Sequence, residues 1–270
     1  MPRERVTITI KEDLLAQVDR LVDGLTIRSR SQAMEYLLSK LLADFRLGTA
    51  LVLAGGKSRS YTGKKPRFLL ELKGKPVIEH VIDRINEFAS PKFHLFVDAP
   101  NRAIVDRFNE RNKGYNLEFL TGSKPKGNIE PLLLAKPFIR DTFLVAYGDS
   151  ICSLNINDML SFHRQNKALA TIALTTVSNP RDYGTAMLQG NKITEFIQKP
   201  RHNVKSYMVN AGYFLFEPGI FRHIDKGMAS LENDLFPKLA EKGLLLGYPF
   251  QGRYLNINSV KDAELAEKLL

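Results

Sequence analysis

The chain has 270 residues, of which 44% are hydrophobic, and this is enough apolar material to bury a core and to exclude intrinsic disorder as its main description. Gly (18) and Pro (13) occur without a Gly-X-Y period, and the single cysteine, Cys152, cannot close an intrachain disulfide, so collagen-like and disulfide-scaffold proteins are excluded. The net charge of +10, from 39 basic and 29 acidic side chains, favours anionic partners such as nucleic acids, nucleotides or sugar phosphates.

A membrane-spanning segment is not expected. The longest stretch without a charged side chain, from Ala168 to Pro180, has 13 residues, whereas a spanning helix needs roughly 20. The N-terminal segment has no apolar run long enough for a secretory signal. We therefore expect a cytoplasmic protein without a membrane partner.

The first predicted elements are one strand and two helices. Hydrophobic and polar residues alternate over residues 5–10, which predicts a half-buried strand. Apolar residues recur at helical spacing over residues 11–23, and again in a helix that begins at Ser29 or Ser31 and ends near residue 48. These three elements alone cannot pair the strand or cover the apolar helix faces, so we expect a second copy of the chain as partner.

After residue 48 the pattern changes to alternating strands and helices, which is typical of a mostly parallel sheet with helices on both faces. We expect two domains, residues 1–47 and 48–270, joined without a flexible linker. Strands are predicted at residues 49–54, 93–97, 117–120, 142–147, 168–175, 185–189, 193–197 and 207–216, and helices at residues 76–88, 102–112, 129–138, 232–242 and 259–270.

The first domain contains the segments RVTITIKEDLLAQVDRLVDG and TIRSRSQAMEYLLSKLL. Over residues 4–46 they resemble the ribbon-helix-helix family of dimeric DNA-binding proteins. The resemblance implies a homodimer in which two strands, one from each chain, form a ribbon that enters the major groove of double-stranded DNA at a palindromic operator. The expected DNA-binding residues are Arg5, Thr7 and Thr9 on the ribbon and Arg28, Ser29, Arg30 and Ser31 at the start of the second helix.

The residue types agree with this assignment. Threonine and arginine side chains can contact base edges, and amides at a helix N-terminus can hold a phosphate. The alternative is a module that only dimerises. Residues 1–48 hold eight basic and seven acidic side chains, and this net charge of +1 gives only a weak electrostatic attraction to the phosphates of DNA.

The second domain contains, in this order, the motifs LVLAGGKSRSYTGKKPRFLLELKGKPVIEHVI, FLVAYGDS, DYGTAMLQGNKITEFIQKP, VNAGYFLF and YLNINSVKD. Over about residues 49–270 they resemble the sugar-nucleotide pyrophosphorylase branch of the nucleotidyltransferase superfamily. The resemblance implies a doubly wound α/β domain of the GT-A-like type, mostly parallel and with a mixed sheet.

A nucleotide site is expected after the first strand of this domain. The glycine pair 55–56 lets the backbone approach a nucleotide, and the amides that follow can hold phosphate oxygens. Between Lys57 and Lys75 there are seven basic residues and only one acidic residue, and Lys65 can act as a point charge for a polyphosphate; an ordinary solvated charge run is the alternative. The expected nucleotide-binding residues are Ala54, Gly55, Gly56, Lys57, Ser58, Arg59, Lys65 and Gly127.

Asp149 ends an apolar strand in the order strand-Gly-Asp, which places a carboxylate at the carboxyl edge of the sheet, where ligands bind. Mg²⁺ bound there would neutralise phosphate charge, and the structural alternative is a helix cap. The resemblance implies that Lys65 and Asp149 are catalytic and that Asp149 and Asn256 hold the metal ion.

The resemblance also implies a sugar-phosphate site. Lys199 would bind the phosphate, and Asn210 and the backbone near Gly184 would contact sugar hydroxyls, although each could instead be a turn or sheet-edge residue. The expected sugar- and phosphate-binding residues are Gly184, Gln198, Lys199, Asn210 and Gly212.

The chain departs from the family pattern at four positions. Ser60 stands where an arginine is usual, Gln198 where an acidic residue is usual, Asn256 where the second metal carboxylate is usual, and Asn258 where a glycine is usual. An amide oxygen can coordinate Mg²⁺ but brings no negative charge, so the metal site is weakened.

Two functions remain open. The first is a DNA-binding transcriptional regulator whose second domain binds a nucleotide, sugar phosphate or nucleotide sugar as effector. The second is an active Mg²⁺-dependent sugar-1-phosphate nucleotidyltransferase with an appended DNA-binding or dimerisation module. The weakened carboxylate pair favours the regulator. Cys152 is expected to be a small buried hydrophobe, and the five histidines show no metal-ligand spacing.

Overall fold

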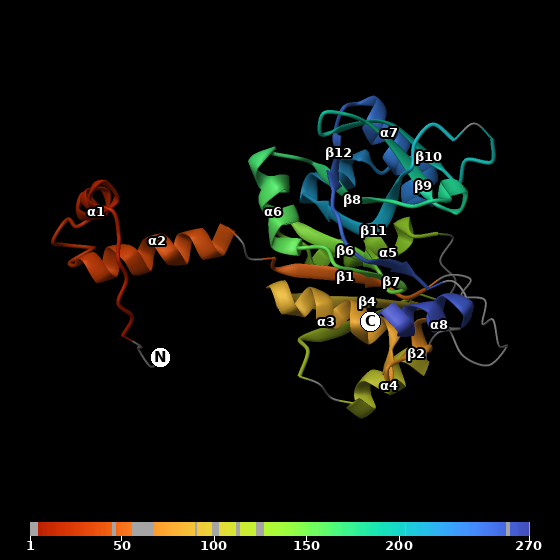
Figure 1. The fold of residues 1–270 in the computed structure, drawn as a ribbon, viewed down its shortest axis with the longest axis horizontal. Helices are drawn as coiled ribbons and strands as arrows, with labels where there is room; N and C mark the ends of the chain where they lie inside the picture. The colour runs from red at the N-terminus through yellow and green to blue at the C-terminus, as the bar shows by residue number, and fades with distance from the viewer. Residues whose placement is uncertain are drawn as a thin grey trace. The chain divides into compact units, whose positions relative to one another are not determined.

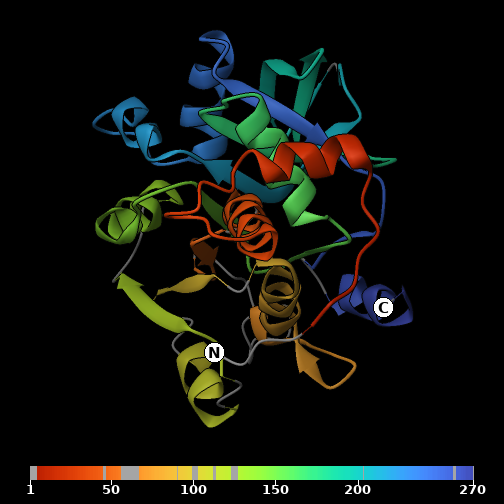
Figure 2. The same ribbon diagram turned by 90° about the vertical axis from the view of Figure 1, so that its left-hand side faces the viewer.

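The structure is a computed structural model that describes residues 5–44, 47–55, 67–89, 91–98, 103–111, 114–122, 127–202, 204–257 and 260–269. The chain divides into two compact units, residues 1–46 and residues 47–270. The elements can be followed from red at the N-terminus to blue at the C-terminus (Figure 1), and in a view turned by 90° (Figure 2). No helix of the described residues is both long enough and apolar enough to cross a membrane.

The first unit contains two helices, α1 (Glu12–Asp19) and α2 (Arg30–Asp44). A turn at Asp23 separates them, because Oδ1 of Asp23 accepts hydrogen bonds from three backbone amides, those of residues 25–27, at 2.7 to 2.9 Å. These hydrogen bonds hold the pKa of the Asp23 carboxyl below its usual value. The helix α1 therefore ends four residues before the predicted end at residue 23.

Ser29, and not Ser31, caps α2. The Ser29 hydroxyl oxygen accepts a hydrogen bond from the Gln32 amide at 3.2 Å, which pairs one of the amides left without a partner in the first turn. The next residue, Arg30, donates two hydrogen bonds to the Asp19 carboxylate, at 2.6 and 2.8 Å, and so joins the start of α2 to the end of α1.

Residues 5–10 do not form the predicted half-buried strand within one chain. Val6 is 75% exposed and Ile8 is 59% exposed. The other described residues of the first unit form helices and turns, and a strand needs a neighbouring strand for its backbone hydrogen bonds. The apolar side of this segment is therefore left open to solvent in the single chain.

The second unit is built on a nine-stranded sheet with the order β5-β4-β1-β6-β11-β8-β12-β10-β9. Two small sheets, β13-β7 and β2-β3, complete it. The strands are β1 (Thr49–Leu53), β2 (Glu71–Leu72), β3 (Lys75–Pro76), β4 (Lys92–Asp98), β5 (Leu117–Gly122), β6 (Phe143–Tyr147), β7 (Ser150–Cys152), β8 (Ala170–Thr176), β9 (Gly184–Gln189), β10 (Lys192–Gln198), β11 (Met208–Phe216), β12 (Leu245–Pro249) and β13 (Tyr254–Asn256).

The sheet is mixed, as expected, and its first half is parallel throughout. The strands β5, β4, β1 and β6 are parallel to their neighbours, and each is reached through a helix or a long connection. Beyond β6 the strand β11 is antiparallel to both β6 and β8, and β10 is antiparallel to β9 and β12. The pair β8–β12 in the second half is also parallel, but the other pairs there are antiparallel and β9 and β10 form a hairpin, so the prediction of a mostly parallel sheet is wrong for this half.

Helices cover both faces of the sheet. Alternate residues of β1 enter two separate cores: Ala50 and Val52 pack with α3, α4, α6 and α8, whereas Leu51 and Leu53 pack with α5 and α7. Figure 1 shows α3 beside β1 and β4. The helices of this unit are α3 (Val77–Ala89), α4 (Ala103–Arg111), α5 (Ile129–Ala135), α6 (Ile156–Gln165), α7 (Phe236–Glu241) and α8 (Val260–Leu269).

Several elements were not predicted. The helix α6 begins at the cap Asn155, whose side chain accepts two backbone amides at 3.1 and 3.2 Å, and its buried residues Ile156, Met159, Leu160 and His163 have helical spacing. The strands β2, β3, β7, β12 and β13 have two to five residues each, too few for a clear period of two.

Candidate ligand-binding site

A cavity of about 300 Å³ lies where the parallel strands β1 and β6 end. This position is the carboxyl edge of the sheet, where α/β proteins bind their ligands. The structure brings together eight of the residues predicted to bind nucleotide, sugar phosphate or metal. Those that line the cavity are Gly55, Asp149, Gly184, Gln198, Lys199, Asn210, Gly212 and Asn256.

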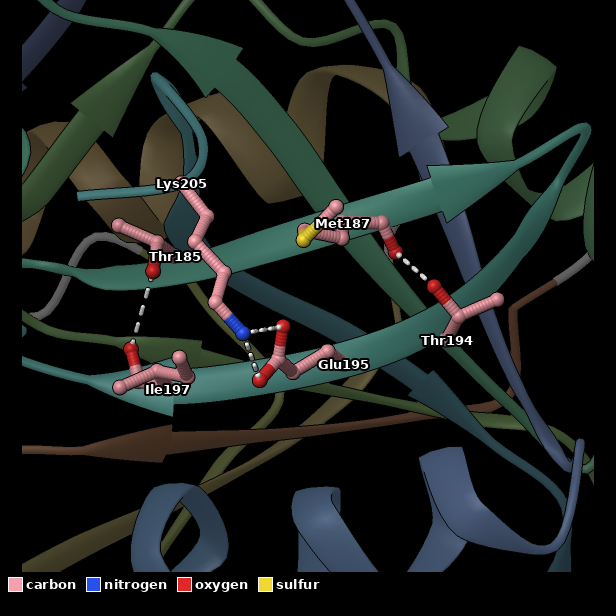
Figure 3. A network of polar contacts seen from close by, with 6 residues as sticks. All are labelled: Thr185, Met187, Thr194, Glu195, Ile197 and Lys205. Carbon is pink, nitrogen blue, oxygen red and sulfur yellow. Dashed lines mark hydrogen bonds and ion pairs between the residues drawn. The ribbon is translucent and has the colours of Figure 1, made fainter. Parts of the chain in front are cut away.

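The hairpin β9–β10 forms one wall of the cavity. In Figure 3, Lys205 pairs with both oxygens of the Glu195 carboxylate, at 2.9 and 3.0 Å. The Thr194 hydroxyl donates to the Met187 carbonyl at 3.3 Å, and the hydroxyl at position 185 donates to the carbonyl of residue 197 at the same distance. These side-chain contacts add to the backbone hydrogen bonds between the two strands, and together they stabilise this wall of the cavity.

At the cavity end of this hairpin, Gly184 lies opposite Gln198. A side chain at position 184 does not fit, because a Cβ there would lie 2.7 Å from the Gln198 Oε1 atom. That oxygen is buried and has no hydrogen-bond partner among the residues that the structure describes. A buried acceptor without a donor is costly, so this oxygen is well suited to accept a hydrogen bond from a ligand hydroxyl or amide.

An irregularity in β11 shapes the opposite wall, between Asn210 and Phe214. Gly212 has a φ of +80°, and the Asn210 Oδ1 atom accepts a hydrogen bond from the Gly212 amide at 2.8 Å. A Cβ on Gly212 would lie 2.8 Å from the Ser150 hydroxyl oxygen. The Asn210 oxygen is therefore engaged by its own backbone, and its amide nitrogen is the part suited to contact a ligand.

Asp149 forms an ion pair that the sequence did not predict. The Arg67 Nη2 atom lies 2.6 Å from the Asp149 Oδ2 atom, and both residues line the cavity. Burial raises the pKa of the Asp149 carboxyl above its usual value, and the Arg67 charge offsets part of this rise. Asp149 precedes the strand β7, so it does not cap a helix.

Asn256 lies near Asp149, although the two residues are far apart in the sequence. The strand β13 pairs with β7, which sets Asn256 opposite Ser150, and the Ile257 amide donates a hydrogen bond to the Asp149 carbonyl at 2.9 Å. The predicted metal residues Asp149 and Asn256 are thus neighbours across a two-stranded ladder.

The donor set does not fit a divalent metal ion. Mg²⁺ prefers several oxygen ligands and negative charge, but Asn256 is neutral and the Asp149 carboxylate is already bound by a guanidinium. Among the residues that the structure describes, no group of three or more His, Cys, Asp or Glu side chains could hold a metal ion. A cation placed beside Asp149 would also meet the positive charge of Arg67.

A partly buried polar network in the cavity wall was also missed from the sequence. The Asn128 amide nitrogen donates to the Tyr147 hydroxyl and to the Glu232 carboxylate, at 2.9 Å each, and the Tyr147 hydroxyl donates to Glu232. Burial, together with the Glu232 charge, raises the pKa of Tyr147 well above its usual value. The three residues come from separate elements, so no spacing along the chain could have linked them.

Two predicted residues do not line the cavity. Ala54 is buried, and its amide donates to the Phe96 carbonyl at 2.9 Å. A Cβ on Gly127 would lie 2.0 Å from the Ala229 carbonyl oxygen, so this glycine permits a close backbone contact, and its neighbour Asn128 faces the cavity instead. The remaining loop positions Gly56, Lys57, Ser58, Arg59, Ser60, Lys64 and Lys65, and also Asn258, lie outside the described residues.

The predicted DNA-binding residues are exposed in the first unit. Arg5, Thr7 and Thr9 lie along the open segment, and Ser31 lies on the first turn of α2. Three others already have local contacts: Ser29 caps α2, Arg30 is paired with Asp19, and the Arg28 Nε atom donates to the Leu25 carbonyl at 3.1 Å.

Cys152 is buried in β7, as expected of a small hydrophobe. Burial raises the pKa of the Cys152 thiol to about 11, which keeps it protonated and unreactive near neutral pH.

The sheet, its two helical layers and the polar cavity at the strand ends define an α/β protein whose cavity lies at the edge of the sheet where proteins of this class bind ligands. A family model described as nucleotidyl transferase matches residues 49–254, which is more than half of the chain. The chain therefore belongs to the nucleotidyl transferase family. A second family model, ribbon-helix-helix protein of the copG family, matches residues 4–44, which confirms the predicted fusion of the two modules.

The chain is similar to mannose-1-phosphate guanylyltransferases. It is 31% identical over 223 residues to the catalytic subunit beta of this enzyme from Danio rerio, a match that covers 79% of this chain and 62% of the relative. It is also 31% identical over 222 residues to mannose-1-phosphate guanyltransferase from Yarrowia lipolytica, covering 78% of this chain and 61% of the relative. The match thus spans about 62% of the length of these relatives.

Solved structures share the fold. HddC from Yersinia pseudotuberculosis, complexed with GMP-PN, matches with a TM-score of 0.69 at 19% identity and covers 83% of this chain and 99% of that chain. A UDP-glucose pyrophosphorylase complexed with UDP-glucose matches with a TM-score of 0.69 at 17% identity, covering 83% and 98%.

Proposed function

We propose that this protein is a DNA-binding transcriptional regulator whose nucleotidyltransferase domain binds a nucleotide, a sugar phosphate or a nucleotide sugar as its effector. One observation carries the proposal: a chain with a ribbon-helix-helix module also has a polar cavity whose expected catalytic carboxylate, Asp149, is bound by Arg67. Such a cavity is better suited to ligand binding than to catalysis of phosphoryl transfer, which needs charge stabilisation at the reacting phosphate.

The DNA-binding half rests on residues 5–10. Their apolar side chains are exposed in the single chain, and pairing with the same segment of a second copy would bury them. In such a two-fold ribbon, Arg5, Thr7 and Thr9 would form the polar face. Arginine and threonine on this face can contact bases of a palindromic site in double-stranded DNA.

The effector half rests on the chemistry of the cavity lining. Arg67 and Lys199 supply positive charge for phosphate groups. The Gln198 oxygen and the Asn210 amide nitrogen are suited to hydroxyl groups of a sugar. Together they match a phosphorylated sugar or a nucleotide sugar better than an apolar ligand.

The two halves make a regulator only if ligand binding and DNA binding are coupled. Coupling requires that the ligand have different affinities for the free and the DNA-bound protein, and it is reciprocal. An effector that weakens DNA binding tenfold must itself bind tenfold more weakly to the DNA complex.

The DNA-binding test begins with a duplex selected by the full-length protein from a random library. In a gel-shift titration, Arg5→Ala should abolish sequence-specific binding and leave ligand binding intact. Lys11→Ala removes the same charge just outside the ribbon and is the matched control, expected to keep the specificity. Equal operator affinity of Arg5→Ala and the wild type would refute the ribbon assignment.

The effector test is a thermal-shift panel with GTP, mannose 1-phosphate, GDP-mannose and UDP-glucose, because a ligand that binds the folded state raises the unfolding temperature. A probe that stabilises the protein should then change the operator affinity in the gel-shift assay. If no probe stabilises the protein at millimolar concentration, the effector proposal is wrong.

A second candidate function is an active sugar-1-phosphate nucleotidyltransferase, and the 31% identity to mannose-1-phosphate guanylyltransferases favours it. In this reaction a phosphate oxygen of the sugar phosphate forms a bond to the α-phosphorus of the nucleotide, the bond to the bridging oxygen breaks, and pyrophosphate leaves. Incubation with Mg²⁺, each NTP and a panel of sugar 1-phosphates should then release pyrophosphate, and Asp149→Ala should stop the release. No release with any pair, while nucleotide binding is still measurable, would exclude this function.

A further inference from the structure

We propose that Arg67 supplies the positive charge that holds a phosphorylated ligand in the cavity, and that the cavity binds this ligand without a divalent metal ion. The inference rests on the proposed function, in which the cavity binds a phosphorylated molecule. It differs from the expectation that Mg²⁺ lies between Asp149 and Asn256.

The position of Arg67 is fixed by the residues that follow it. Arg67 opens the short 3₁₀ helix Arg67–Leu69, and the next side chain, Phe68, is buried against Gly148, 3.3 Å from where a Cβ on that glycine would lie. Gly148 directly precedes Asp149. The packing of Phe68 against Gly148 therefore brings the backbone of Arg67 close to that of Asp149, where the ion pair can form.

The ion pair is partly open to the cavity. The Arg67 side chain is 27% exposed and the Asp149 side chain is 7% exposed. The guanidinium can therefore meet an anion that enters the cavity while it keeps its contact with Asp149. A guanidinium matches phosphate oxygens in a planar, two-pronged arrangement.

Among the described residues, the charge of the Asp149 carboxylate is offset by Arg67. One carboxylate is opposed by one guanidinium, and Asn256 adds an amide oxygen without charge. A divalent ion at this point would be opposed by Arg67 and would find one carboxylate where a stable site needs more oxygen ligands. A phosphate, in contrast, gains attraction from Arg67.

The other carboxylates of the cavity do not rebuild a metal site. Glu232 accepts hydrogen bonds from Asn128, Tyr147 and Ser230. Asp182 lies on the exposed turn before Tyr183. In the part of the chain that the structure describes, these acids do not gather with Asp149 into a group that could hold a metal ion.

The metal half of the inference can be tested on the free protein with Mn²⁺ as the probe, by electron paramagnetic resonance. The wild type should bind Mn²⁺ no better than its Asp149→Asn variant. The double variant Arg67→Leu/Asn256→Asp removes the guanidinium and restores a second carboxylate, so its Mn²⁺ affinity should rise by about tenfold or more. Tight Mn²⁺ binding by the wild type that is lost in Asp149→Asn would overturn the inference.

The ligand half is tested by calorimetry with GDP-mannose and UDP-glucose, in EDTA and in Mg²⁺. The wild-type affinity should agree between the two conditions within about twofold, which is well below 1 kcal/mol. Arg67→Gln should weaken binding by about 10-fold to 100-fold, the effect of one charge-assisted hydrogen bond. Arg222→Gln, at an exposed arginine away from the cavity lining, controls for the change in net charge.

Arg67→Gln leaves the buried Asp149 without a charged partner, so Arg67→Lys is measured beside it. The Arg67→Lys variant keeps the positive charge and should retain more affinity than Arg67→Gln. The comparison of binding in EDTA and in Mg²⁺ uses the wild type and therefore does not depend on how any variant folds. Binding that disappears in EDTA would refute the inference while upholding the proposed effector. No binding of either nucleotide sugar or of mannose 1-phosphate would refute the proposed effector instead, and the Mn²⁺ measurement would still decide the metal question.

Discussion

The Asn128 side-chain oxygen accepts a hydrogen bond from the Leu231 amide at 2.7 Å, across 103 positions of sequence. The same side chain donates to Tyr147 and Glu232 through its nitrogen. A single carboxamide thus joins the start of α5, the end of β6 and the turn that precedes α7, all on one side of the cavity.

Asn128→Ala should destabilise the protein by about 1 to 3 kcal/mol, because it leaves the buried Leu231 amide and the Glu232 carboxylate short of a partner. Asn191→Ala, at an exposed residue in the turn between β9 and β10, is the matched control and should stay within about 0.5 kcal/mol of the wild type. Urea unfolding of the full chain measures both. Equal stability of the two variants would mean that the Asn128 hydrogen bonds contribute nothing.

Substitutions at Gly212 and Gly190 separate two costs of adding a Cβ atom, the steric clash with neighbouring atoms and the strain of a positive φ. Both have positive φ, +80° and +58°, but a Cβ on Gly212 would press on Ser150 and Tyr147, whereas a Cβ on Gly190 would meet nothing within 4 Å. Gly190→Ala should cost about 1 to 2 kcal/mol from backbone strain alone. Gly212→Ala should cost about 1 to 3 kcal/mol more, from overpacking, and should also weaken ligand binding in the calorimeter. Similar losses for both variants would contradict the packing described at the cavity wall.

The pH dependence of stability should depend in part on His94. Burial lowers the pKa of His94, the Glu118 carboxylate offsets part of this, and Lys92 lowers the pKa further. The folded chain therefore prefers the neutral ring, which stacks on Phe138, whereas the unfolded chain takes up a proton near pH 6.5. Stability should fall as the pH drops below about 6.5 and level off below the folded pKa.

His94→Leu should remove this part of the pH dependence and lose less stability than the wild type between about pH 7.5 and 5. Thermal unfolding at a series of pH values measures it. His202→Ala changes an exposed histidine and should follow the wild-type curve. A His94→Leu curve parallel to the wild type would show that His94 is not the titrating group.

The two serines at the start of α2 can be separated by experiment. Ser29→Ala removes the oxygen that accepts the Gln32 amide and should destabilise the first turn of α2 by about 1 kcal/mol. Ser31→Ala, which changes a serine two residues further along the chain, should have little effect on the stability of this turn. Hydrogen exchange of the α2 amides gives the readout, and faster exchange in Ser31→Ala than in Ser29→Ala would reverse the assignment of the cap.

The long elements of the second unit could be predicted because their patterns are strong. The buried strands β1, β4 and β6 appear as apolar runs, and α3 has an apolar stripe, so their predicted bounds differ from the observed ones by no more than one residue at each end. The segment at residues 5–10 was a different case: its alternating pattern predicts a half-buried strand, but its apolar side chains Val6 and Ile8 are exposed in the single chain.

The site could be predicted only where a motif marks it. Asp149 and Gln198 stand at strand ends within recognisable motifs, whereas Arg67 was one of seven basic residues in a charged stretch. Its contact with Asp149 joins two segments that are far apart in the sequence, which is a property of the folded chain. Asn128 and Glu232 carry no local signal at all, because their partners lie on other elements.

The pairing of β13 with β7 means that the cavity is completed only after residues 254–256, the last of its lining residues in chain order, have been synthesised. A nascent chain exposes its ribbon-helix-helix segment long before the ribosome has made residues 254–256, and N-terminal domains fold first during synthesis. On the proposed function, the pairing of two ribbons would therefore precede ligand binding during synthesis.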